Sequence, residues 1–222
     1  MKNVYIYCEG QTEEAFVNNV LYPYFFNNDI YVCPIICSTK RTASKKYKGG
    51  ILNYGKMKHE LPIICKSHPH EIVTTMFDYY GMPDDTPGID CSEADIFKRI
   101  ETIEKAISDD MGQANLIVNL MLHEFESVLF SDPQCFNSIT DDSDAVLQLQ
   151  RMRDEANSPE HINNSVETAP SKRIISAIPD YAKIRDGLIV STEIGMNKML
   201  SECKHFAAWI EKIHKFNLSN RE

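Results

Sequence analysis

Several features that mark secreted, membrane-bound and nucleotide-binding proteins are missing from this chain of 222 residues. No apolar run is long enough to cross a bilayer, and Met1 to Asn3 lead directly into an apolar stretch, so we expect neither a membrane span nor a secretory signal. The seven cysteines include no Cys-x-x-Cys pair, which favours free thiols in a reducing cytoplasm over disulfides or a zinc knuckle. No P-loop and no Gly-x-Gly-x-x-Gly occur, so we do not expect ATP binding through those motifs.

The composition that remains is that of an acidic globular protein. Hydrophobic residues make up 43% of the chain, which is enough for a proper core. A length of 222 residues suits one domain, or one domain with a helical extension. The net charge of -9 argues against coating a polyanion by bulk charge, although it leaves room for a local basic patch.

Such a basic patch lies between Thr39 and His59, where lysines and an arginine occur without any acidic residue. Because the charge is so unmixed, we interpret the segment as contacting a phosphate backbone, and the alternative is a solvated loop. Its basic residues are Lys40, Arg41, Lys45, Lys46, Lys48, Lys56 and Lys58.

Apolar runs alternate with stretches of helical spacing over the first part of the chain. This alternation predicts an α/β fold with a mostly parallel four-stranded sheet flanked by helices over residues 1–135. Residues 136–222 are predicted to be an all-helical extension packed on that core, with Trp209 inside it. Pro34 indicates an edge strand or a bulge. The expected strands are 4–8, 30–37, 70–81 and 115–122. Of the expected helices between them, the first is opened by Thr12 or Gln11 and continues over 15–26, the second occupies at least part of 51–66, and the third spans 92–110.

Acidic residues stand at three of the predicted strand ends. Glu9 follows the first strand, Asp78 ends the third, and Glu124 and Glu126 follow the fourth. Parallel strands put these ends on one edge of the sheet, where the acids would repel strongly unless a cation or shared protons relieved them. Glu13, four residues after Glu9, can face the same point, so carboxylates converge as a hard-cation site requires. The alternative is that Glu9 and Glu13 are a solvated turn and a charge at a helix start.

A second basic feature opens a late helix. Ser171 is a suitable N-cap, and Lys172 and Arg173 occupy the first turn, where a helix prefers acids. Two cations beside free backbone N–H groups predict a phosphate-binding position. The alternative is an ordinary basic helix start on the surface.

Four motifs spread over most of the chain resemble those of the Toprim domain, the metal-binding domain of topoisomerases, bacterial primases and the overcoming-lysogenization-defect nucleases. More closely, the chain resembles an uncharacterised family of small stand-alone Toprim-like proteins related to the RloB type. The motifs are Cys8-Glu9-Gly10-Gln11-Thr12-Glu13, Met76-Phe77-Asp78-Tyr79-Tyr80-Gly81, His123-Glu124-Phe125-Glu126 with Leu129-Phe130, and Pro170-Ser171-Lys172-Arg173.

The resemblance implies that the predicted sheet is Toprim- or Rossmann-like and that it carries a nuclease-like site for two Mg²⁺ or Mn²⁺ ions. Glu9 matches the Toprim glutamate, Glu13 the second carboxylate of the nuclease branch, and Asp78 the first acid of an Asp-x-Asp motif. Tyr80 stands where the second acid of that motif is expected, which puts full metal occupancy in doubt.

Later motifs supply the other groups that the resemblance implies. Glu124 or Glu126 could fill the position that Tyr80 vacates, and Lys172 resembles the late lysine that neutralises charge at the scissile phosphate. Glu9, Asp78, Glu126 and Lys172 are thus the expected catalytic set. His123 is either a general base or a structural residue at the turn.

The function expected from these features is divalent-metal-dependent cleavage of DNA or RNA, tRNA included. By analogy with small Toprim proteins, we expect an ABC- or AAA-type ATPase partner and a role as effector of bacterial anti-phage defence. A non-catalytic module that docks on an ATPase or a nucleic acid is the alternative, and another phosphoryl-transfer enzyme is a third.

Overall fold

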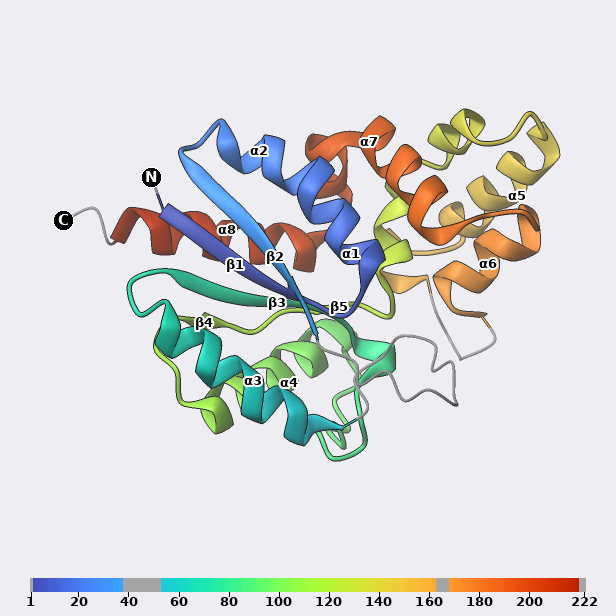
Figure 1. Cartoon of the computed structure of the whole chain (residues 1–222). Coiled ribbons are helices and arrows are strands. Elements are labelled where there is room, and N and C mark those ends of the chain that lie inside the picture. The colour runs from blue at the N-terminus through green and yellow to red at the C-terminus, as the bar shows by residue number, and fades with distance from the viewer. Residues whose placement is uncertain (1, 38–52, 163–167, 220–222) are drawn as a thin grey trace, which may run out of the picture.

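A parallel sheet organises the chain, which a computed structural model describes over residues 2–37, 53–162 and 168–219. The strands run in the order β2-β1-β3-β4, β5 also pairs with β3, and each of these pairings is parallel. Figure 1 shows the sheet with helices around it, so the predicted α/β fold is confirmed. The strands are β1 (Lys2–Cys8), β2 (Ile30–Ile36), β3 (Ile72–Asp78), β4 (Leu116–Ile117) and β5 (Leu120–Met121).

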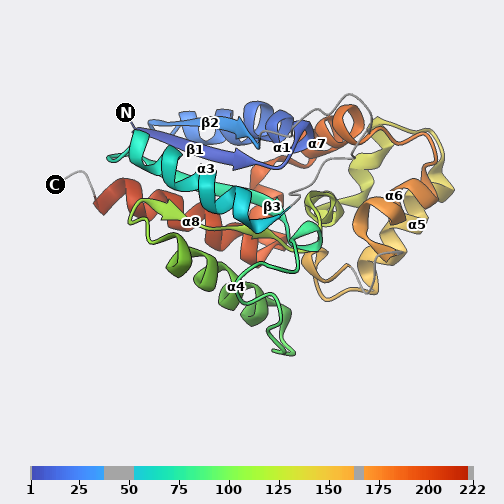
Figure 2. The same ribbon diagram turned by 60° about the horizontal axis from the view of Figure 1, so that its bottom comes forward.

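Helices cover both faces of the sheet, which explains the nearly continuous apolar character of its central strands. Val4 and Ile6 of β1 pack on one helical layer, whereas Tyr7 packs on the other. Figures 1 and 2 show the two layers from different sides. The first layer contains α1 (Gln11–Phe16), the π-helical turn η1 (Val17–Leu21), α2 (Tyr22–Phe26), α7 (Lys183–Glu202) and α8 (Lys204–Ser219). The second contains α3 (Tyr54–Ser67) and α4 (Ile96–Met111).

The C-terminal helices share the core of the sheet. Trp209 of α8 is buried, and its Nε1 donates a hydrogen bond to Thr74 Oγ1 of β3 at 2.8 Å. None of the helices in the described residues is long and apolar enough to span a membrane. The remaining elements, most of them beyond the carboxyl end of the sheet, are η2 (Tyr79–Gly81), η3 (Phe125–Ser131), η4 (Pro133–Ser138), α5 (Ser143–Asp154), η5 (Pro159–His161) and α6 (Pro170–Ala177).

The fourth predicted strand differs from the structure, because the run 115–122 is broken into β4 and β5. Side-chain hydrogen bonds replace the ladder at the break: Thr75 Oγ1 donates to Asn119 O at 2.7 Å and accepts from Asn119 N at 2.8 Å. A strand whose backbone groups are satisfied by a threonine hydroxyl no longer needs regular pairing. Pro34 lies in β2, an edge strand, as the sequence predicted.

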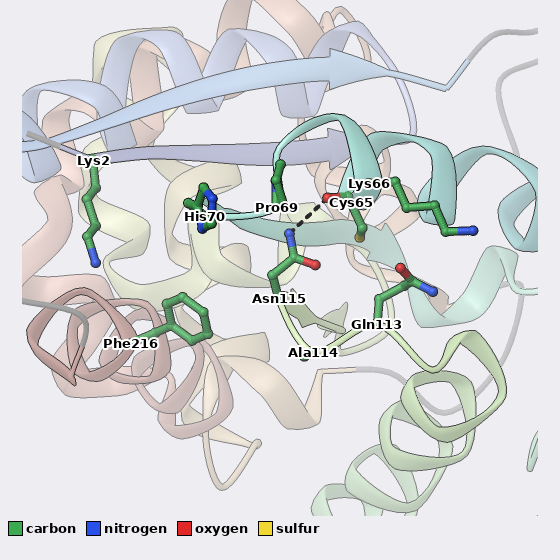
Figure 3. Close-up of a pocket in the computed structure, with 9 residues that line it drawn as sticks. All are labelled: Lys2, Cys65, Lys66, Pro69, His70, Gln113, Ala114, Asn115 and Phe216. Atoms are coloured by element: carbon green, nitrogen blue, oxygen red, sulfur yellow. Dashed lines mark hydrogen bonds between the residues drawn. The ribbon is translucent and has the colours of Figure 1, made fainter.

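A surface cavity of about 470 Å³ opens at the amino end of the sheet, far from the acid-bearing strand ends (Figure 3). Its polar centre is Asn115, whose Nδ2 donates to the carbonyl groups of Cys65, His68 and Glu71 at 2.9–3.2 Å. These bonds tie the start of β4 to the end of α3, so Asn115 has a structural role there.

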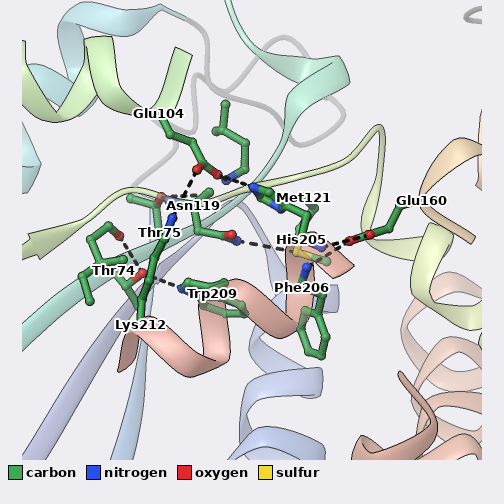
Figure 4. Close-up of polar contacts among 12 residues, drawn as sticks. Thr74, Thr75, Glu104, Asn119, Met121, Glu160, His205, Phe206, Trp209 and Lys212 are labelled. Carbon is green, nitrogen blue, oxygen red and sulfur yellow. Dashed lines mark hydrogen bonds and ion pairs between the residues drawn. The ribbon is translucent and has the colours of Figure 1, made fainter. Parts of the chain in front are cut away.

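A buried polar layer lies at the break between β4 and β5 (Figure 4). Glu104 of α4 accepts a hydrogen bond from Leu120 N at 2.9 Å and pairs with His205 Nε2 at 2.9 Å. Glu160 accepts from His205 N and Phe206 N, so its carboxylate caps the start of α8. The layer therefore links α4, β5, η5 and α8 just before the chain reaches Glu124.

Candidate functional site

Three strand ends bring their acidic residues together at the carboxyl edge of the sheet. Glu9 follows β1, and its Oε2 lies 3.4 Å from the backbone N of Asp78, the last residue of β3. Asp78 Oδ1 in turn accepts a hydrogen bond from Phe125 N at 2.8 Å, in the segment that follows β5. The side chains at the ends of β1 and β3 therefore each reach the next segment, as the strand order requires.

Glu13 joins the group from the first turn of α1. Its Oε2 accepts a hydrogen bond from Gly10 N at 2.7 Å, which satisfies an amide at the start of the helix. The carboxylate is 7% exposed, and the charge of Glu9 is one of the influences that raise the pKa of Glu13, after burial. Glu13 therefore caps its own helix and faces the acid group as well.

Glu124 and Glu126 extend the group from the far side of Asp78. Glu124 Oε2 accepts a hydrogen bond from Ser171 N at 2.9 Å. Glu126 is 2% exposed, and its Oε1 lies 3.0 Å from Lys183 Nζ at the first residue of α7. Lys183 Nζ is the partner of this buried oxygen among the described residues.

The five carboxylates, which we call the acid cluster, are Glu9, Glu13, Asp78, Glu124 and Glu126. Burial raises the pKa of Asp78 well above its usual value, and the charges of Glu9, Glu13, Glu126 and Glu124 raise it further. Burial also raises the pKa of Glu9, against the opposing effects of the Asp78 amide and Lys183. So many acids beside one lysine require either protons or added cations at neutral pH.

Lys183 is the site residue that the sequence did not single out. Burial would lower the pKa of Lys183, but Glu126 and Glu124 outweigh that effect and raise it. A signal was present, because a lysine in the first turn of a helix opposes the helix dipole, as Lys172 and Arg173 do. A lysine in the first turn predicted a phosphate-binding position at α6, and the same feature marks Lys183 at the start of α7.

The predicted phosphate position at α6 needs correction. Pro170 begins the helix and Ala169 is its N-cap, so the prediction that Ser171 caps it is wrong. Proline suits the first helical position, which moves the cap back to Ala169. The Ser171 N–H is already bonded to Glu124, so the chain's own carboxylate takes the place expected for a phosphate. Lys172 is exposed and makes no ion pair with the described residues, and Arg173 Nε donates to Thr168 O at 2.8 Å.

The main part of the predicted basic patch, Lys40 to Lys48, lies outside the described residues. It follows β2 directly, and Cys37 N donates to Cys8 O at 2.8 Å, one residue before Glu9. At the described end of the patch, Lys58 Nζ forms an ion pair with Asp110 at 2.7 Å. The basic residues outside the description are Lys40, Arg41, Lys45, Lys46 and Lys48.

Comparison with known families gives one match, which covers nearly the whole chain. The model of a domain of unknown function (DUF4276) matches residues 8–214, a range that includes the acid cluster and Lys183. The chain belongs to the DUF4276 family. No curated protein and no solved structure matches it.

The acid cluster of this DUF4276 chain offers carboxylate oxygens, which are the ligands that hard divalent cations prefer. Glu126 Oε1 supports that fit, since this buried acceptor has no partner besides the Lys183 ammonium group among the described residues. Tyr181 supplies a second buried oxygen without a hydrogen bond from the described residues, and burial and Glu126 raise its pKa. A Cβ on Gly187 would lie 2.9 Å from that hydroxyl, so the glycine leaves room for it. In residues 2–37, 53–162 and 168–219, no three ligand side chains are already gathered around one metal position.

His123 shapes the turn that carries Glu124 into the cluster. Its backbone is left-handed, with φ at 66°, and its carbonyl accepts a hydrogen bond from Tyr80 N at 3.1 Å. The imidazole is buried, and burial and His161 lower its pKa to about 4. A neutral, enclosed imidazole on a strained turn favours the structural role over the general-base role.

We predict that His123→Gly gives a more stable protein than His123→Ala, by about 1 kcal/mol, because glycine tolerates the left-handed backbone. Both substitutions remove the imidazole, so the difference between them isolates the backbone conformation. Urea unfolding followed by circular dichroism measures both free energies of unfolding. Equal stability of the two variants would show that the turn relaxes to an ordinary conformation.

Proposed function

We propose that this DUF4276 protein is a divalent-metal-dependent nuclease that hydrolyses phosphodiester bonds in DNA or RNA. The observation that carries the proposal is the acid cluster, in which three strand ends and a helix start contribute carboxylates beside Lys183. Structural carboxylates are seldom grouped so closely without compensating charge, and perturbed pKa values at one sheet edge are typical of functional sites. The same motifs resemble those of the Toprim domain, which is why we propose phosphodiester hydrolysis at this cluster.

In this proposal Glu9, Asp78 and Glu126 would hold Mg²⁺ or Mn²⁺, and Glu13 and Glu124 would complete the donor set for a second ion. Bound there, such ions would supply an activated water and positive charge for the scissile phosphate and its leaving oxygen. The protein keeps the carboxylates in place through the Asp78–Phe125 and Glu124–Ser171 hydrogen bonds.

Lys183 takes the part that the sequence assigned to Lys172. Its ammonium group lies within the acid cluster, whereas the exposed Lys172 forms no ion pair with a described residue. A cation fixed beside the reacting phosphate stabilises charge where it develops. Lys172 and Arg173, one and two residues beyond Ser171, remain candidates for holding the nucleic-acid backbone nearby.

The test is cleavage of plasmid, single-stranded DNA and tRNA in Mg²⁺ or Mn²⁺, compared with chelator. We expect wild type to cleave at least one substrate, and we expect Glu9→Ala and Asp78→Ala to lose that activity. Undiminished cleavage by both variants would attribute the activity to another site or to a contaminant. An ATPase partner of the ABC or AAA class and a role in anti-phage defence extend this proposal by analogy with small Toprim proteins.

A non-catalytic binding module is the second candidate, and Tyr80 favours it. Tyr80 occupies the position of the second motif acid, it is 37% exposed, and it cannot serve as a carboxylate ligand. Thermal unfolding with added Mg²⁺ or Mn²⁺ separates the two functions, because a ligand that binds the folded state raises the melting temperature. A metal-independent melting temperature in wild type would favour docking on an ATPase or a nucleic acid.

A further inference from the structure

We propose that Lys183 is an exchangeable counter-ion: its ammonium group neutralises Glu126 in the metal-free protein, and Glu126 exchanges it for a divalent cation when one binds. This inference rests on the proposed metal site and adds a conformational step to it. The released ammonium group then becomes available to an incoming phosphate. Metal binding and the placement of the catalytic cation are thereby coupled through one carboxylate.

The geometry around Glu126 carries the argument. Its Oε1 is fully enclosed and has Lys183 Nζ, at 3.0 Å, as its partner among the described residues. The side chain of Glu126 is 2% exposed, whereas that of Lys183 is 43% exposed. The carboxylate is thus fixed in the protein, while the lysine reaches it from the surface on a flexible stem and can withdraw into water.

The charges in the acid cluster also favour exchange of Lys183 for a divalent cation. Lys183 is the cation whose charge acts on Glu9, Glu13 and Glu126 alike, so it occupies the region where a bound cation would relieve all three. Two positive ions in that region would repel each other. This repulsion favours loss of the close contact between Glu126 and the ammonium group when Glu126 ligates a divalent ion.

Lys198 is a matched control further along α7, beyond the kink at Gly195. Its side chain is also 43% exposed and also pairs with a glutamate, Glu202, at 2.7 Å. The difference is that Glu202 belongs to the surface of α7 and not to the acid cluster. Any effect of metal on Lys183 that arises from exchange at Glu126 should therefore be absent at Lys198.

The first experiment measures acylation of individual lysines by an N-hydroxysuccinimide ester, read by peptide mass spectrometry, with and without Mg²⁺. We expect Mg²⁺ to raise the rate at Lys183 several-fold and to leave the rate at Lys198 unchanged. An unchanged rate at Lys183, in protein whose melting temperature Mg²⁺ does raise, would overturn the exchange and leave the metal site standing. If Mg²⁺ raises neither the rate nor the melting temperature, the proposed function fails together with the exchange.

The second experiment measures Mn²⁺ affinity by calorimetry in the full chain. Lys183→Met removes the competing charge and keeps much of the apolar stem, so we expect binding to tighten about tenfold or more. Lys183→Arg should bind Mn²⁺ with the affinity of wild type, and Lys198→Met should not change that affinity. Adding Glu126→Gln to Lys183→Met should cancel the gain in affinity. Weaker or unchanged binding in Lys183→Met, with a native circular dichroism spectrum, would overturn the exchange.

Discussion

Replacing Asp78 by asparagine is expected to stabilise the metal-free protein at neutral pH and to abolish metal-dependent cleavage. Asparagine keeps the shape of the side chain and an oxygen that can accept the Phe125 N–H, so the 2.8 Å contact can persist. It removes a charge that burial and four neighbouring carboxylates disfavour. We expect the free energy of unfolding to rise by on the order of 1 to 2 kcal/mol in chelator.

Urea unfolding in chelator, with Glu101→Gln as control, measures this gain. Glu101 is an exposed acid of α4, so its neutralisation should change stability by less than about 0.5 kcal/mol. The same variants are then assayed for Mg²⁺-dependent cleavage, which Asp78→Asn should lose and Glu101→Gln should keep. If Asp78→Asn were destabilised in chelator, the ionised Asp78 side chain would be stabilised in the metal-free protein. The cluster would then need no cation.

The pH dependence of stability follows from the same charges. Asp78, Glu9, Glu13 and Glu126 have a folded-state pKa above the unfolded values of about 3.9 for Asp and 4.3 for Glu. Their contribution to stability is therefore complete below about pH 4 and is lost as pH rises through the raised pKa values. In chelator, wild type should lose this contribution as pH rises above about 4, and Asp78→Asn should lose less of it. Added Mg²⁺ should reduce the loss.

The location of the acid cluster could be predicted because it depends on topology. Alternating strands and helices force a parallel sheet, and a parallel sheet places residues that follow different strands on one edge. Glu9, Asp78 and Glu124 needed no information beyond their positions relative to apolar runs. The same reasoning could not place Lys183, because its approach depends on how α7 packs against η3, far along the chain.

Two other differences have the same kind of cause. The break between β4 and β5 depends on hydrogen bonds with Thr75 and Glu104. These two residues belong to other elements, so the apolar run 115–122 alone does not predict the break. The start of α6 depends on Glu124, which bonds Ser171 N and so removes a group that looked available for a ligand. Local patterns therefore predicted which kinds of elements form and in what order, whereas long-range side-chain contacts decided where some of them begin or break and which polar groups were still unoccupied.

Removing the carboxylate of Glu104 is expected to cost about 3 to 5 kcal/mol of folding free energy, because it leaves two buried partners without an acceptor. Leu120 N and His205 Nε2 both contact Glu104 Oε1 at 2.9 Å, and the Glu104 and His205 side chains are each 6% exposed. Glu104→Ala should therefore be far less stable than Glu104→Gln, whose amide oxygen can still accept from Leu120 N. Glu101→Ala, one turn earlier on the exposed side of α4, provides the control.

The same substitution should also weaken the acid cluster, although Glu104 does not belong to it. Leu120 lies in β5, four residues before Glu124, and the polar layer at Glu104 and His205 holds that strand against α4 and α8. A less firmly held β5 places Glu124 and Glu126 less accurately, so the rise in melting temperature with Mn²⁺ should be smaller in Glu104→Ala than in Glu104→Gln. Urea unfolding and metal-dependent melting curves measure the two effects separately. A Glu104→Ala protein within 1 kcal/mol of wild type, with a full response to Mn²⁺, would show that β5 is held by its apolar contacts and that the polar layer is dispensable to the site.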